Sequence, residues 1–110
     1  WVPRPLKAAD LNGDGKPDIV GALIHDVGYL PPGKAAVFWM DASDWSTRVI
    51  KWSDGSDTNS KGRGEKWDHI RFANVDGDGD LDIVANAEEH YDEKRNSYLG
   101  VVWFENPLKP

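Results

Sequence analysis

The sequence predicts an all-β fold in which one structural unit occurs twice in tandem. The chain has 110 residues, and residues 5–43 align with residues 69–107 at a constant offset of 64 without a gap. Nine of the 39 aligned pairs are identical. Several segments are rich in β-branched and aromatic residues, which favours strands, and no segment shows the 3.6-residue period of a helix. Gly, Pro, Asp and Asn lie between these segments, as expected for turns.

Four strands are expected in the first unit. A short strand at residues 6–9 leads into an acidic loop, and the largely apolar run at residues 18–24 follows that loop. Residues 35–40 combine alanine, valine, phenylalanine and tryptophan, a composition that suits a pleated sheet. Residues 46–52 alternate between polar and apolar side chains, which is the pattern of a half-buried strand.

Three strands are expected in the second unit, at residues 70–73, 82–86 and 99–104. Each of them is the counterpart of one of the first three strands of the first unit. The sequence ends before any counterpart of residues 46–52, so the second unit lacks its fourth strand. The chain starts at Trp1 rather than Met, and we therefore expect it to be processed or excised from a longer polypeptide.

The boundary between the units is set by a polar segment. Residues 53–66 contain no apolar side chain and are interpreted as a solvated surface connector rather than a binding loop. We therefore assign residues 1–66, including this connector, to the first unit and residues 67–110 to the second unit.

Composition excludes several function classes. The chain has 13 Lys and Arg and 19 Asp and Glu, which gives a net charge of −6. A chain with this negative charge is a poor candidate for binding a nucleic-acid backbone. The chain has no Cys, which excludes disulfides, thiolate metal sites and cysteine nucleophiles. No apolar stretch approaches the length of a membrane-spanning helix.

The strongest chemical signal is the spacing of oxygen-bearing side chains in two nine-residue loops. Residues at loop positions 1, 3, 5 and 9 carry the oxygens, and the backbone carbonyl at position 7 is a natural further ligand. The predicted ligands are Asp10, Asn12, Asp14, Lys16 and Asp18 in the first loop, and Asn74, Asp76, Asp78, Asp80 and Asp82 in the second. Crowded carboxylates repel one another, and a hard cation removes this cost. The all-oxygen set therefore predicts two Ca²⁺ sites, ahead of Mg²⁺ and without the His or Cys that zinc prefers.

The acidity of the chain resides in these two loops. Residues 10–18 carry a net charge of −2 and residues 74–82 carry −4, which together equal the charge of the whole chain. The remaining residues are electrically balanced, so the negative charge is better interpreted as metal chemistry than as a general surface property.

Two other interpretations of the loops are an EF-hand and an acidic turn without a metal. An EF-hand requires Glu at position 12, where this chain has Gly21 and Ala85. The Ile-Val pairs that follow both loops favour strands rather than the helices of an EF-hand. An acidic turn without a metal remains the alternative, although it does not account for two aligned copies.

The pattern D-x-N/D-G-D-G-x-x-D followed by Ile-Val resembles the FG-GAP or VCBS repeat of integrin-type β-propellers and secreted bacterial proteins. The resemblance implies two tandem four-stranded β-propeller blades, the second incomplete, each binding Ca²⁺ between its first two strands. It also implies an extracellular or cell-surface module for recognition or scaffolding, with a protein or carbohydrate ligand. Asn74 at position 1 departs from the pattern and supplies one charge fewer, but an amide can still donate an oxygen.

Tryptophans occupy equivalent places in the third strands. Trp39 and Trp103 are 64 residues apart and are expected to pack between adjacent blades, with a sugar-stacking platform as the alternative. Trp52 and Trp67 flank the polar connector, where one of them could be exposed.

Two further functions are alternatives. The chain could be a blade of a secreted carbohydrate-active enzyme such as a polysaccharide lyase, with His90, Tyr91 and Arg95 near the active site. Adjacent residues in a strand face opposite ways, which weighs against this set, and whether the protein is an enzyme stays open. Because two units cannot close a propeller, the blades need further repeats or copies of the chain, and a self-assembling repeat protein is the other alternative.

Overall fold

The computed structural model describes residues 2–24, 33–53, 65–91 and 96–106, and it confirms the all-β fold. The first unit forms a four-stranded antiparallel sheet with the order β1-β2-β3-β4, and the second forms a three-stranded antiparallel sheet with the order β5-β6-β7. The strands are β1 (Val2–Ala9), β2 (Asp18–Ile24), β3 (Ala35–Met40), β4 (Thr47–Trp52), β5 (Glu65–Ala73), β6 (Asp82–Tyr91) and β7 (Asn96–Phe104). The described residues contain no helix long and apolar enough to cross a membrane.

Several strands run further than the apolar pattern predicts. β2 and β3 have the expected bounds, but β5 begins within the segment interpreted as a polar connector, and β6 and β7 extend through polar residues to the pair Tyr91 and Asn96. Antiparallel pairing explains this length, because backbone hydrogen bonds continue along a hairpin whatever the polarity of its side chains. β1 contains two prolines and a register shift between Pro3 and Leu6, which an edge strand tolerates.

The two sheets repeat one another at the level of register. Val20 pairs with Trp39 in the first sheet, and their counterparts Val84 and Trp103 pair in the second. The pairing of β1 with β2 recurs in the same way in that of β5 with β6, since Ala9 faces Asp18 and Ala73 faces Asp82. The repeat in the sequence is therefore a repeat in three dimensions.

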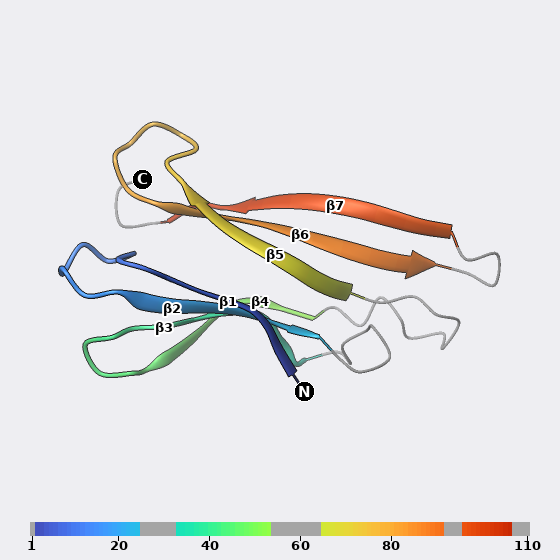
Figure 1. The fold of residues 1–110 in the computed structure, drawn as a ribbon, viewed down its shortest axis with the longest axis horizontal. Coiled ribbons are helices and arrows are strands. Elements are labelled where there is room, and N and C mark those ends of the chain that lie inside the picture. The colour runs from blue at the N-terminus through green and yellow to red at the C-terminus, as the bar shows by residue number, and fades with distance from the viewer. Residues whose placement is uncertain (1, 25–32, 54–64, 92–95, 107–110) are drawn as a thin grey trace.

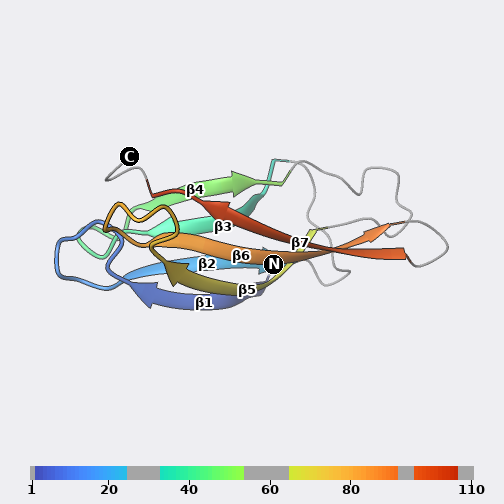
Figure 2. The ribbon, with the colours of Figure 1, turned by 90° about the horizontal axis from the view of Figure 1, so that it is seen from above.

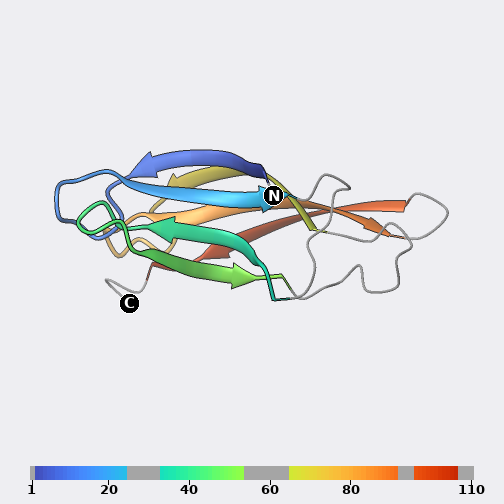
Figure 3. The ribbon, with the colours of Figure 1, turned by 90° about the horizontal axis from the view of Figure 1, so that it is seen from below.

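The sheets stack face to face as two layers (Figure 1). β5 lies over β1 and runs in the same direction, and β6 and β7 run in the directions of β2 and β3 (Figures 2 and 3). The core between the layers takes fully buried side chains from both sheets, among them Val20, Ala22 and Val37 from the first and Ile70 from the second. Trp67 is also buried in this core, with its ring centroid 6.2 Å from that of Phe104.

The tryptophans behave differently although their sequence positions are equivalent. Trp39 is half-buried and packs against the core, as expected for a residue between blades. Trp103 is 44% exposed, because the face of the second sheet that bears it is turned away from the first sheet. Of the pair beside the connector, Trp67 is buried and Trp52 is 58% exposed.

A buried aspartate ends each acidic loop and joins two segments that are distant in sequence. The carboxylate of Asp18 accepts hydrogen bonds from the backbone N–H of Leu11, at 3.0 Å, and of Ala42, at 2.8 Å. Asp82 accepts the equivalent bonds from Val75, at 2.9 Å, and Asn106, at 2.8 Å. Both carboxylates are fully buried, so these bonds fix the start of the loop to the segment that follows the third strand.

The two units also differ in how one pair of cross-strand partners packs. A Cβ on Gly21 would collide with the ring of Phe38, its cross-strand partner, and with Leu6. In the second sheet the corresponding pair is Ala85 and Val102. The first unit thus pairs a glycine with a large aromatic ring, and the second unit pairs the larger alanine with the smaller valine.

Replacing Gly21 by Ala should destabilise the protein by about 1–3 kcal/mol, the usual range for inserting a methyl group into a packed site. Adding Phe38→Val in the same chain should recover part of the loss, because this double variant copies the pair found in the second sheet. Urea unfolding of both single variants and the double variant measures the coupling. Gly100→Ala is the matched control, since its nearest neighbour would lie 4.0 Å from the new Cβ, and a strictly additive double variant would contradict the packing account.

Acid should weaken the second sheet through Asp82. The backbone N–H groups of Asn106 and Val75 hold the pKa of this carboxyl below its usual value of 3.8, although burial opposes them. A folded pKa below the unfolded one contributes stability that is complete above the usual value and is lost as the pH falls through the lowered pKa. Urea unfolding between neutral and strongly acidic pH should therefore show a smaller acid dependence for Asp82→Asn than for the unchanged chain, and equal dependences would refute this role.

Candidate metal centre

The two acidic loops, residues 10–17 and 74–81, connect β1 to β2 and β5 to β6 and lie at the same end of the molecule (Figure 1). Residues of both loops line one cavity, namely Asp10, Leu11, Asn12, Gly13, Gly79, Asp80 and Leu81. The loops turn through backbone conformations with positive φ at both glycines of each motif. The angles are 76° and 85° in the first loop and 83° and 102° in the second, which only glycine adopts without strain.

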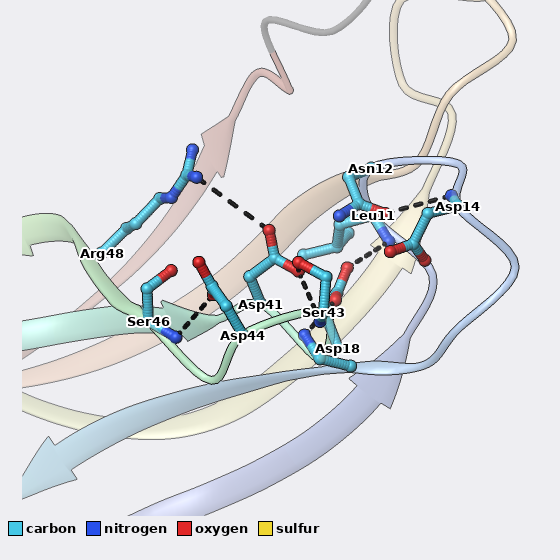
Figure 4. Close-up of polar contacts among 10 residues, drawn as sticks. Leu11, Asn12, Asp14, Asp18, Asp41, Ser43, Asp44, Ser46 and Arg48 are labelled. Carbon is cyan, nitrogen blue, oxygen red and sulfur yellow. Dashed lines mark hydrogen bonds and ion pairs between the residues drawn. The ribbon is translucent and has the colours of Figure 1, made fainter.

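In the first loop the side chains at positions 1, 3 and 5 accept hydrogen bonds from the loop backbone. Asp10 accepts from Gly13 and Gly15, both at 2.8 Å, and from Asp14 at 3.1 Å. Asn12 and Asp14 each accept from the residue two places further on, at 3.1 and 2.8 Å. The side chains of Asn12 and Asp14 both lie within the curve of the loop (Figure 4).

The second loop follows the same scheme with fewer bonds at its first position. Asn74 accepts from Gly77 at 2.9 Å, Asp76 accepts from Asp78 at 3.1 Å, and Asp78 accepts from Asp80 at 3.0 Å. An amide has one acceptor oxygen where a carboxylate has two. The bond that Gly15 donates to the second oxygen of Asp10 thus has no equivalent at Asn74 among the described residues.

Positions 7 and 9 complete the predicted ligand sets. At position 7, Lys16 is exposed, whereas the Asp80 side chain is buried at the cavity between the loops. At position 9, each oxygen of Asp18 and Asp82 already accepts one backbone N–H. A carboxylate oxygen has two lone pairs, so one such bond leaves room for a cation on the same atom.

The chemistry of the loops fits a hard divalent cation, whereas their geometry stops short of a formed centre. Each loop offers only oxygen donors, and the Oδ2 atom of Asp78 is buried without a hydrogen-bond partner, which is costly for a carboxylate. The described residues contain no group of three or more Asp, Glu, His or Cys side chains placed to hold one metal ion. The structure therefore brings the predicted ligands into two small loops but does not converge their carboxylates on one point, and the ligand assignment stays a prediction.

The structure places one further carboxylate, that of Asp41, beside the first loop, although Asp41 lies outside the nine-residue motif. Its side chain is nearly buried beside the first loop, near Asn12 and Asp18 (Figure 4). Hydrogen bonds from the hydroxyl and backbone N–H of Ser43 lower the pKa of Asp41, assisted by Arg48 at 3.9 Å and by Asn12. The repeat offered a way to identify Asp41 from the sequence, because its counterpart Glu105 is also acidic.

Asn106 is the second residue that the sequence did not reveal. Its Nδ2 donates to the backbone carbonyl of Leu11 in the first loop, at 2.7 Å, and of Leu81 in the second, at 3.0 Å. Its backbone N–H donates to Asp82. The counterpart of Asn106 is Ala42, so the repeat in the sequence does not predict the hydrogen bonds that Asn106 donates to the two loops.

For the residues of the enzyme alternative, the structure describes backbone pairing at most. His90 and Tyr91 are consecutive residues at the end of β6, where they pair with Ser97 and Asn96, and Arg95 lies outside the described residues.

Comparison with known proteins was made on family models, curated proteins and solved structures. The family model of the FG-GAP-like repeat matches residues 10–85, which include both acidic loops. No curated protein and no solved structure matched the chain. Repeats of this family commonly bind calcium. The matched segment spans most of the chain and holds both copies of the motif, so the chain belongs to the FG-GAP-like repeat family.

Proposed function

We propose that the chain is a calcium-stabilised FG-GAP repeat module that serves recognition or scaffolding outside the cell. The observation that carries the proposal is the duplicated loop, in which the side chains at positions 1, 3 and 5 accept hydrogen bonds from the loop backbone in both copies. The expected ligand of the module is a protein or a carbohydrate, and further repeats or copies of the chain are its expected neighbours.

The loop residues would hold the ion as follows. Positions 1, 3 and 5 supply the side-chain oxygens, position 7 its carbonyl, and position 9 the buried carboxylate that anchors the loop to the sheet. The glycines allow the backbone to bring these groups together. Bound Ca²⁺ would supply positive charge that offsets the repulsion between the loop carboxylates.

The electrostatics of the loops suit an extracellular setting. The first motif carries a net charge of −2, and a neutral amide stands at position 3 of the first loop and position 1 of the second. Extracellular calcium modules bind in the range of about 10⁻⁴–10⁻³ M, weaker than cytosolic sensors, and affinity follows the charge and rigidity of the ligand set. Loops of this kind would be filled where calcium is abundant.

Calcium should raise the melting temperature of the chain. At a free calcium concentration 100 times the Kd, one site adds about 2.7 kcal/mol of stability, which corresponds to a rise of roughly 10 °C for a domain of this size. Calorimetric scans in calcium and in EDTA measure the difference, and isothermal titration calorimetry gives the number of sites, expected to be two.

Two loop variants and one control locate the effect. Asp14→Asn and Asp78→Asn remove the carboxylate at position 5 of one loop each, and each should leave one site in the titration. Asp44→Asn makes the same change in an exposed turn outside the loops and should keep both sites. If calcium leaves the melting temperature unchanged and releases no heat, the calcium proposal is wrong.

The departure at Asn74 should set the order of affinities between the loops. Asn74→Asp restores a second acceptor oxygen and a negative charge at position 1, so the second loop should bind calcium several-fold more tightly. The reciprocal change Asp10→Asn should weaken the first loop, which also loses the hydrogen bond from Gly15. Titration of each variant in a background where Asp→Asn at position 5 silences the other loop isolates the single site. An unchanged affinity in both variants would show that position 1 is not a ligand.

A further inference from the structure

Each sheet has two faces, and the stack within the chain uses a different one from each sheet. Cross-strand partners share a face, so the pairing register defines both. We call the rear face the one formed by Val20, Ala22, Val37 and Trp39 in the first sheet and by Val84, Asn86, Val101 and Trp103 in the second. We call the front face the one formed by Leu6, Ile19, Gly21, Phe38 and Met40 in the first sheet and by Ile70, Ile83, Ala85, Val102 and Phe104 in the second.

The interface within the chain joins the rear face of the first sheet to the front face of the second. Val20, Ala22 and Val37 of that rear face are fully buried, and so is Ile70 of that front face. An apolar cavity at the seam is lined from the first sheet by Trp39 and Ile50 and from the second by Ile83 and Phe104, among other residues. The buried side chains of the two faces belong to one hydrophobic core.

The other copy of each face is open. Leu6 is 54% exposed on the front face of the first sheet, whereas its counterpart Ile70 is fully buried. Val101 is 70% exposed on the rear face of the second sheet, whereas its counterpart Val37 is fully buried. Apolar side chains with buried counterparts thus lie in solvent on both outer surfaces of the stack.

We propose that these two open faces bind each other between copies of this chain. The front face of the first sheet in one copy would stack on the rear face of the second sheet in the next, repeating the contact already present within the chain. The two faces differ, so the contact is head to tail, and repeated stacking gives a ring if the rotation closes and a filament if it does not. The surface thereby selects a second copy over an unrelated partner, because its complement already exists on the same molecule.

Small differences at the open faces set the strength of the contact. Asn86 stands where the buried rear face has Ala22, and Phe38 over Gly21 stands where the buried front face has Val102 over Ala85. The contact within the chain also gains from the high effective concentration of linked units. Association between copies is therefore expected at micromolar to millimolar protein concentrations rather than below.

Sedimentation velocity of the 110-residue chain in calcium buffer tests the proposal, with one charged variant for each open face. Val101→Glu blocks the rear face and Leu6→Glu blocks the front face, both at side chains that are exposed in the single chain. Each variant alone should stay monomeric where the unchanged chain associates. A 1:1 mixture should form a dimer and nothing larger, because one variant retains the front face and the other retains the rear face.

The mixture separates head-to-tail stacking from the alternatives. Trp45→Glu is the control, because Trp45 is a comparably exposed apolar residue in the turn between β3 and β4, and it should associate like the unchanged chain. Circular dichroism of each variant establishes that it is folded. A monomeric unchanged chain at millimolar concentration overturns the proposal, and so does a self-associating single variant, which would mean that identical faces pair.

Discussion

The buried carboxylate at the ninth loop position is the interaction on which the remainder of the structure depends. Asp18 and Asp82 each tie the beginning of an acidic loop to the segment after the third strand, and neither oxygen is left without a donor. A buried carboxylate is tolerated only with such partners. The loop geometry, the end of the sheet and the place of Asn106 at the seam between the loops all follow from this one constraint.

Stacking of equivalent units explains why identical residues have different surroundings. Val37 and Val101 occupy the same register position, yet one is fully buried and the other is 70% exposed. Local sequence cannot produce that difference, because the alternation and the pairing with the preceding strand are the same. Val37 also has β4 beside it, whereas β7 is the edge strand of the second sheet. The difference in exposure therefore arises from this neighbouring strand and from position in the stack, where a sheet is covered only on the side that has a neighbour. In a repeat architecture the exposed fraction of a side chain therefore depends on which units lie beside its own unit, and not only on whether the residue is polar or apolar.

The sequence predicted the repeat, the all-β class and the strands β2 and β3, because each has a short-range physical signature. Alternation and β-branched composition act within a few residues. The lengths of β6 and β7 escaped prediction because a hairpin extends by backbone bonds that ignore side-chain polarity. Asn106 escaped because its partner Leu11 is 95 residues away and its counterpart is alanine. Asp41 was within reach, since both units have an acidic residue there, but it lies outside the nine-residue motif.

The hydrogen bonds of the loops also constrain what a cation could contribute. The backbone N–H groups already hold the side chains at positions 1, 3 and 5, and Asp18 and Asp82 hold the loop ends. A loop ordered by these bonds pays less entropy on binding an ion than an unstructured one, which favours affinity. The same bonds leave the carboxylates apart, so binding requires rotations of side chains within an existing loop rather than folding around the metal. A bound ion would then act mainly by offsetting negative charge, and most strongly in the second loop, which has four carboxylates and no lysine.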